Sequence, residues 1–219
     1  MVNLKKYKAY LFDMDGTLVS SEKLKGSAIS RACHILGGKV DLNIYKEVMG
    51  ESWEVVTNHF FEAAKISPNM DEFNDEFNRI YKRLLHDELR LTSNVKEFLL
   101  ELSKNGKKIG VVSSAATWMV NQILEQFQLS ELFNIVITKE NVTQRKPHPE
   151  AYLLALNELS LTSSEVLIFE DSSAGLLAAK GAHCDAIAVE HEFNSNNNLS
   201  LALEVITDFR EVMNNSSVK

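Results

Sequence analysis

The chain has 219 residues, of which 45% are hydrophobic, so it can bury a core as one large domain or as a core with a small accessory domain. Its 30 Asp and Glu residues outnumber 23 Lys and Arg, and the formal net charge of -7 has the wrong sign for a protein that coats nucleic acid. The only apolar run near the N-terminus is short and is interrupted by Asp13 and Asp15, so we expect a cytoplasmic protein without a signal peptide or a membrane span.

Short apolar runs alternate along most of the chain with longer amphipathic stretches, which is typical of a parallel sheet covered by helices. The expected strands are Ala9–Asp13, Lys108–Ser113, Ile135–Thr138, Val166–Glu170 and Ala186–Val189. The helices expected after the second, third and fourth of them are Thr117–Phe127, Pro149–Leu159 and Ser173–Ala182. This order predicts an α/β protein with a Rossmann-like parallel sheet.

The interval from about Val19 to Leu91 breaks this alternation, because it contains no strand-like run. Apolar residues recur there at helical spacing. The expected helices are Glu22–Leu36, Asn43–Met49, Trp53–Lys65 and Asp71–Leu85. We therefore expect an inserted α-helical cap domain over residues 18–91 and an α/β catalytic core formed by residues 1–17 and 92–219.

The first group of candidate site residues follows the first strand. Asp13 and Asp15 are two residues apart, and in a turn both carboxylates can converge on one ligand. A carboxylate can attack phosphorus, and a second one can protonate the leaving oxygen and later deprotonate water. Gly16 allows a sharp turn, and the hydroxyl of Thr17 can donate to a phosphate oxygen. The alternative is an ordinary surface turn.

Two further strand ends carry groups that suit a phosphate. Ser113 and Ser114 precede an expected helix, where hydroxyls and backbone N–H groups form a phosphate cradle, although a helix-capping serine would give the same pattern. Lys146 stands beside Pro147 in a segment that two prolines stiffen, which would hold one cation in a fixed place.

Glu170 and Asp171 are adjacent carboxylates at the end of the fourth expected strand. Such neighbours repel each other unless a cation is present, and hard oxygen ligands favour Mg²⁺ over Zn²⁺. We therefore expect Mg²⁺ as the cofactor.

The order and spacing of these four strand ends resemble the haloacid dehalogenase (HAD) superfamily, and the likeness covers essentially the whole chain, closest to the β-phosphoglucomutase-like branch. The resemblance implies that Asp13 is the nucleophile and a metal ligand. It implies that Asp15 is the general acid and base and gives its main-chain carbonyl to the metal. Asp171 would complete the metal site, and Glu170 would bind the metal directly or through water. The resemblance further implies that Ser113 and Lys146 hold the phosphoryl oxygens.

Within that family, the carboxylate of Asp15 favours phosphate ester chemistry, because it is useful where an alcohol leaving group needs a proton. We expect a Mg²⁺-dependent phosphatase that hydrolyses a small phosphorylated metabolite, such as a sugar phosphate, through an aspartyl phosphate. The alternative is a phosphosugar mutase of the β-phosphoglucomutase type, in which a sugar hydroxyl receives the phosphoryl group.

The cap stretch Gly50-Glu51-Ser52-Trp53 is the candidate specificity segment, and it departs from the mutase. It offers Trp53 where the mutase carries an arginine for the second phosphate, and Ala116 replaces a core lysine of the mutase. A substrate with one phosphate is therefore expected. Trp53 can stack on a sugar or belong to the cap core, and Trp118 is expected in the core.

Two other classes share parts of this pattern. A non-catalytic phosphate-binding module is expected to lose Asp13 or Asp15, and both are present. A receiver domain has acidic strand ends, but it lacks an inserted cap and the second carboxylate. The expected partner is a small phosphorylated metabolite, with no nucleic acid and no membrane, and the expected assembly is a monomer or weak dimer.

Overall fold

The computed structural model describes residues 2–215, which divide into two compact units. The first, the core unit, comprises the described residues up to Val19, Leu91–His191 and the described residues from Asn198 onward. The second, the cap unit, comprises Ser20–Arg90 together with Glu192–Asn197. The chain thus leaves the core unit twice, once for the helical insertion and once for a short segment near its end.

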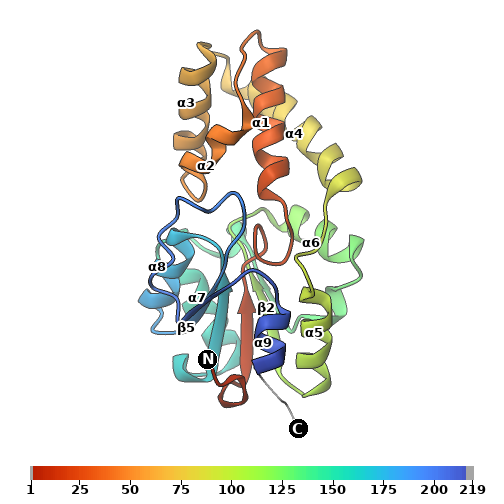
Figure 1. Ribbon diagram of the computed structural model, residues 1–219, viewed down its shortest axis with the longest axis vertical. Helices are drawn as coiled ribbons and strands as arrows, with labels where there is room; N and C mark the ends of the chain where they lie inside the picture. Colours follow the sequence, from red (N-terminus) through yellow and green to blue (C-terminus); the bar gives the residue numbers. More distant parts are fainter. Residues whose placement is uncertain (1, 216–219) are drawn as a thin grey trace. The chain divides into compact units, whose positions relative to one another are not determined.

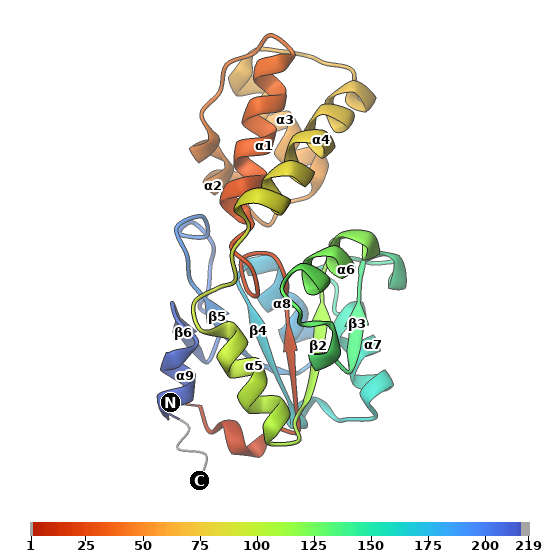
Figure 2. The same cartoon turned by 90° about the vertical axis from the view of Figure 1, so that its right-hand side faces the viewer.

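The core unit contains a six-stranded sheet in the order β3-β2-β1-β4-β5-β6, and every neighbouring pair is parallel (Figure 2). Its strands are β1 Ala9–Phe12, β2 Lys108–Val112, β3 Ile135–Ile137, β4 Val166–Glu170, β5 Asp185–Val189 and β6 Glu204–Ile206. The predicted α/β fold with a Rossmann-like parallel sheet is confirmed. Five strands were expected, and β6 is an addition at the sheet edge.

Side chains alternate between the two faces of the sheet, and both faces are buried. On one face, Leu11 and Ile168 belong to a core completed by α7 Glu150–Leu159 and α8 Ser173–Gly181. On the other face, aromatic side chains of β1 and β4 meet those of α5 Val95–Lys104 and of the segment before α9 Arg210–Asn215. The rings of Phe12 and Phe169 stack there with centroids 4.9 Å apart. The strands that carry the candidate site therefore rest on packed side chains from both faces.

The remaining core helix is α6 Thr117–Gln126, and short 3-10 turns complete both units. These turns are Leu4–Lys6, Leu42–Ile44, Ser130–Leu132, Lys139–Asn141 and Ser163–Glu165. Trp118 lies on α6 with 44% of its surface exposed, so its expected place in the core is wrong. In the described part of the chain, we find no helix with both the length and the apolar character needed to cross a membrane.

Four helices form most of the cap unit: α1 Glu22–Ile35, α2 Tyr45–Val48, α3 Trp53–Ala64 and α4 Met70–Glu88 (Figure 1). The side chain of Asn69 begins α4 by accepting hydrogen bonds from the N–H groups of Asp71 and Glu72. Apolar residues at helical spacing give α4 one apolar face. This helix packs closely against α1.

The segment Glu192–Asn197 belongs to the cap unit although it follows β5 in the chain. Phe193 is 3% exposed and lies near the ring of Tyr45. Glu192 pairs with Lys46 at 2.8 Å between Oε1 and Nζ. These contacts make the segment a structural part of the cap unit.

Candidate active site

The carboxyl ends of β1, β2 and β4 meet at the point where the chain order of the sheet reverses. β1 lies between β2 and β4, so successive connections run outward in opposite directions from it. Open parallel sheets bind ligands at such a switch point, beyond the carboxyl ends of the strands. The candidate residues of the core unit lie at or just after these strand ends, except Lys146, which lies in the loop that precedes α7.

A tight turn presents Asp13 at the end of β1. The Asp13 N–H donates to Phe169 O at 2.9 Å, which continues the ladder between β1 and β4 by one residue. Gly16 has φ +75°, and a Cβ placed on it would lie 2.0 Å from Oδ2 of Asp171. Only glycine therefore allows the turn to approach Asp171 so closely.

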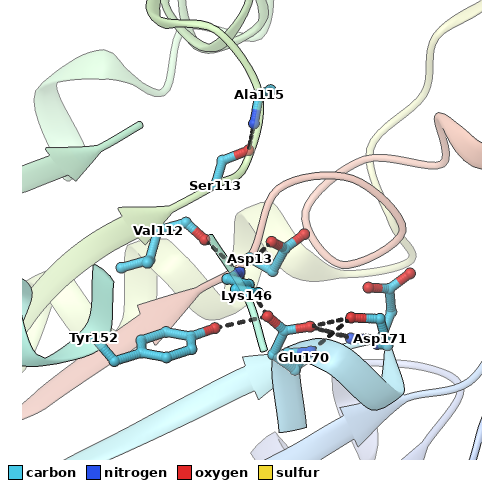
Figure 3. A network of polar contacts seen from close by, with 10 residues as sticks. Asp13, Val112, Ser113, Ala115, Lys146, Tyr152, Glu170 and Asp171 are labelled. Carbon is cyan, nitrogen blue, oxygen red and sulfur yellow. Dashed lines mark hydrogen bonds and ion pairs between the residues drawn. The ribbon is translucent and has the colours of Figure 1, made fainter. Parts of the chain in front are cut away.

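The Lys146 ammonium is bound at the centre of the site (Figure 3). Its Nζ lies 2.6 Å from Asp13 Oδ1, 2.6 Å from Glu170 Oε1 and 2.8 Å from the carbonyl oxygen of Val112. An ammonium has three N–H donors, so all three have acceptors. Lys146 is thus a fixed positive charge beside Asp13, and Asp13 Oδ2 receives no hydrogen bond within residues 2–215.

The loop that carries Lys146 is fixed by the first residue of α7. The carboxylate of Glu150 accepts the N–H groups of Thr143 and Gln144, each at 2.8 Å. Both donors lie just ahead of Lys146 in the chain, so these bonds hold the loop against the helix start.

Glu170 anchors Lys146 and is fully buried. Its Oε1 also accepts the phenol of Tyr152 at 2.7 Å, and its Oε2 accepts the Asp171 N–H at 3.1 Å and the Ser172 hydroxyl at 3.2 Å (Figure 3). Both oxygens therefore have protein donors. A carboxylate with this many partners is held in one orientation.

The site contains more buried negative charge than Lys146 can balance. Burial raises the pKa of Asp13 well above its usual value, Lys146 opposes that rise, and the charges of Glu170 and Asp171 add to it. Burial opposes the charge of Lys146, but Asp13 and Glu170 raise its pKa above the usual value, so it stays protonated. The three carboxylates around one ammonium favour the binding of an additional cation.

The donor set suits Mg²⁺. Asp13 and Asp171 are 8% and 4% exposed, and the main chain of Asp15 lies in the turn just before Gly16. No three His, Cys, Asp or Glu side chains within residues 2–215 form a metal-binding cluster. Two carboxylates, a carbonyl oxygen and waters are nevertheless the hard and incomplete set that Mg²⁺ uses beside a phosphate.

The predicted phosphate-binding hydroxyls differ in exposure. Ser113 is 5% exposed and its Oγ accepts the N–H of Ala115 at 3.0 Å, whereas Ser114 is exposed. The hydroxyl of Thr17 is buried and has no hydrogen-bond partner among the described residues. Such an orphaned donor is costly unless something else accepts it, which fits a role toward an anion.

The four cap residues of the candidate specificity segment belong to the cap unit. Ser52 caps α3 by accepting the N–H of Val55. The indole N–H of Trp53 donates to Asn74 at 3.0 Å, and its ring lies 4.6 Å from that of Phe77. Gly50 has φ +89°, and Glu51 is exposed. Trp53 is therefore half-buried within the cap's own aromatic cluster.

Two site residues were not predicted from the sequence. Tyr152 supports Glu170 from α7, and nothing in its sequence context distinguishes it from a core tyrosine. His191 follows β5, and its Nε2 lies 3.0 Å from Asp171 Oδ2. His191 is a polar residue two positions after the fifth expected strand, so the signal that singled out the four predicted groups of site residues could also have found it.

The phenol of Tyr152 gives a testable prediction. Its pKa is raised far above the usual value by burial and then by the charge of Glu170, so it remains a donor. We expect Tyr152→Phe to lose about 1 kcal/mol of unfolding free energy and several-fold in kcat with little change in KM. Urea unfolding and steady-state kinetics would measure both.

Tyr10 provides the matched control for that variant. Its buried hydroxyl donates to the Leu4 carbonyl at 2.6 Å, away from the carboxylates. We expect Tyr10→Phe to show a similar loss of stability with unchanged kcat. An equal fall in kcat for both variants would make the role of Tyr152 purely structural.

Comparison with known proteins identifies the family of this chain. The sequence pattern of haloacid dehalogenase-like hydrolases matches residues 10–189. The chain is 28% identical, over 85% of its length and 87% of the relative's, to a phosphorylated carbohydrates phosphatase of Thermotoga maritima. It is 26% identical to a phosphoglycolate phosphatase of Photorhabdus laumondii, over 96% of this chain and 92% of that one.

Solved structures give the same picture. The crystal structure of a predicted phosphoglycolate phosphatase from Haemophilus somnus superposes with a TM-score of 0.86 at 25% identity, covering 97% of this chain and 99% of that chain. A Thermotoga maritima protein proposed to be a beta-phosphoglucomutase superposes with a TM-score of 0.80 at 26% identity, covering 94% and 97%. The predicted family and its hydrolase chemistry are therefore confirmed, and the chain belongs to the haloacid dehalogenase-like hydrolases.

Proposed function

We propose that this hydrolase is a Mg²⁺-dependent phosphatase that acts on a small phosphorylated metabolite through an aspartyl phosphate. The observation that carries the proposal is the distance of 2.6 Å between Lys146 Nζ and Asp13 Oδ1. At this distance the ammonium offsets the negative charge of the nucleophile where a phosphoryl group would bind. The named relatives act on phosphorylated carbohydrates and phosphoglycolate, which makes these the first substrates to test.

Each residue of the core unit has a role in this proposal. Asp13 Oδ2 attacks phosphorus, the bond from phosphorus to the substrate oxygen breaks, and Asp15 gives that oxygen a proton. Asp15 then takes a proton from water, which attacks the aspartyl phosphate and releases inorganic phosphate. Bound Mg²⁺ would supply positive charge to the phosphoryl oxygens and would be held by Asp13, Asp171 and the Asp15 carbonyl.

The other predicted residues support these groups. We propose that Ser113, Ser114 and Thr17 hold the phosphoryl oxygens and that Glu170 reaches the metal through water while it anchors Lys146. Gly50, Glu51, Ser52 and Trp53 are proposed to select the substrate from the cap. The protein is proposed to act in the cytoplasm as a monomer or weak dimer.

A panel of phosphorylated metabolites tests the proposal. We expect steady phosphate release with Mg²⁺ from a sugar phosphate or phosphoglycolate, and its complete loss in EDTA with recovery when Mg²⁺ is restored. A single turnover without further release would instead indicate a receiver-type module. Conversion of a sugar phosphate to its isomer, without free phosphate, would indicate a mutase.

The role of Asp15 is tested by the leaving group. We expect Asp15→Asn to lower kcat by about 10²–10⁴-fold with an alkyl phosphate, because the departing alkoxide needs a proton. With p-nitrophenyl phosphate, whose leaving group departs unprotonated, we expect a much smaller fall in the phosphorylation step measured in single-turnover experiments. Equal losses with both substrates would contradict the acid role.

A further inference from the structure

A groove in the cap unit gathers positive charge that the proposed function does not use. It has a volume of about 540 Å³. The lining residues come from α1, α4 and the loop after α1, and they are Ser30, Arg31, His34, Ile35, Lys39, Val40, Arg79, Ile80 and Arg83. All of them belong to the cap unit, so the groove is complete within one unit.

The charge of this groove is opposite to that of the whole chain. The chain has a formal net charge of -7, yet no lining residue is Asp or Glu and four are Arg or Lys. Arg79 pairs with Glu76 outside the lining set, at 3.0 Å between Nε and Oε2. Arg31, Lys39 and Arg83 have no carboxylate partner among the described residues. Three of the lining cations therefore have no ion pair within residues 2–215.

The placement of these cations is unfavourable without an anion. Arg79 and Arg83 are four residues apart on α4, so their like charges lie on the same side of the helix, and Glu76 balances only Arg79. Lys39 is brought to the same groove by the turn through Gly37, and Ser30 fixes that loop by donating to the Val40 carbonyl at 2.6 Å. Anionic groups placed among them would balance these charges.

The groove also has an apolar component. Ile35 is 53% exposed, and the lining also includes Val40 and the buried Ile80. Exposed isoleucine next to guanidinium groups offers a surface for a flat ring, while arginine forks pair with phosphate oxygens through two hydrogen bonds. The volume falls within the range of about 300–1,000 Å³ that small-molecule sites occupy.

We propose that this groove is a second binding site, separate from the phosphatase chemistry, for a nucleoside diphosphate or triphosphate. Arg31, Lys39 and Arg83 bind the phosphate chain, and the nucleobase rests on Ile35. The choice of ligand rests on the charge and shape of the groove. Several cations without an ion pair favour a ligand with more than one phosphate, and the exposed apolar side chain favours a ring.

Calorimetric titration of the full chain with ADP tests the proposal. The Asp13→Asn variant prevents turnover during the titration, and the double variants described next distinguish the groove from the catalytic site. We expect binding of one ADP per chain, with adenosine and phosphate alone each binding at least about tenfold more weakly, because each probe retains only part of the contacts. Absence of ADP binding at millimolar concentration would overturn the proposal.

A matched pair of double variants locates the binding. Arg31→Gln with Arg83→Gln removes two groove cations, and we expect ADP affinity to fall at least about tenfold. Lys23→Gln with Lys82→Gln removes two charges from the same helices outside the groove lining, and we expect affinity within about twofold of the parent at 0.15 M salt, where distant charges are screened.

These titrations distinguish an ADP site in the groove from binding elsewhere on the chain. Equal affinity in both double variants would place ADP elsewhere and overturn the proposal. Tight binding of a polyglutamate peptide with no binding of ADP would identify an acidic peptide as the ligand and also overturn it. If the parent protein has no phosphatase activity, the proposed function fails, but the groove proposal is still tested because ADP binding is measured directly.

Discussion

Asp13→Asn is expected to lower phosphatase kcat by at least about 10⁴-fold, because an amide cannot act as the phosphoryl acceptor and removal of a nucleophile costs this much in other hydrolases. Lys146 and Glu170 keep their contact at 2.6 Å, so the site should stay assembled. The measurement is phosphate release at saturating Mg²⁺. Trapping of a phosphorylated chain by acid quench should succeed with the parent and fail with the variant.

The same variant should be more stable than the parent when metal is absent. Burial and two neighbouring carboxylates disfavour the charge of Asp13 more than Lys146 favours it. The amide removes that cost, and we expect a gain of about 1–2 kcal/mol in EDTA at neutral pH. Urea unfolding would show it. A variant that retained activity, or one that lost stability in EDTA, would contradict the assignment of Asp13.

Lys146→Met should have the second large effect, on both activity and stability. The substitution leaves Asp13 and Glu170 buried and without their cation. Loss of one partner of a buried pair typically costs about 3–5 kcal/mol, and loss of charge stabilisation near the phosphoryl group costs about 10²–10³-fold in kcat. Urea unfolding and steady-state kinetics at saturating Mg²⁺ would measure both.

The stability loss of Lys146→Met should depend on pH in a defined direction. The pKa of Asp13 is already raised, and removal of Lys146 takes away the charge that lowers it. A carboxylate with a raised pKa in the folded state costs stability above its unfolded pKa, and that cost disappears as pH falls. The difference between variant and parent should therefore shrink from pH 7.5 to pH 5.5 in EDTA.

A double variant provides the control for that interpretation. Asp13→Asn with Lys146→Met removes one of the stranded charges together with the lysine. We expect it to be more stable than Lys146→Met alone, because only Glu170 then lacks its cation. Equal stability of the two proteins would mean that Lys146 stabilises the fold by packing and not by charge.

The α/β core could be predicted because its strands are buried on both faces and therefore appear as uninterrupted apolar runs. Val166–Glu170 was predicted with the bounds that the structure has. β6 Glu204–Ile206 was missed because it contains a charged residue and an exposed valine, whereas the equally short edge strand β3 Ile135–Ile137 is wholly apolar. α5 and α9 were missed because neither helix directly follows one of the five expected strands.

The candidate site was predicted to the extent that its residues follow strands directly. Asp13 and Glu170 are brought together because parallel strands end at one edge, which the alternating pattern implies, and Lys146 reaches both from the loop before α7. The hydrogen-bond partners of each site residue depend on packing between distant segments, so the role of Tyr152 could not be predicted from the sequence. The exposed position of Trp118 likewise depends on which face of α6 meets the sheet.

The assignment of Glu192–Asn197 to the cap unit has a consequence for protein engineering. A swap or deletion designed from the insertion alone would exchange Ser20–Arg90 and leave Phe193 behind without Tyr45. A chimaera that inherits only the helices would expose the ring of Phe193 and separate Glu192 from Lys46. Grafts should therefore carry both pieces, and the short piece begins at the peptide bond that follows His191, so its sequence bears directly on the residue that contacts Asp171.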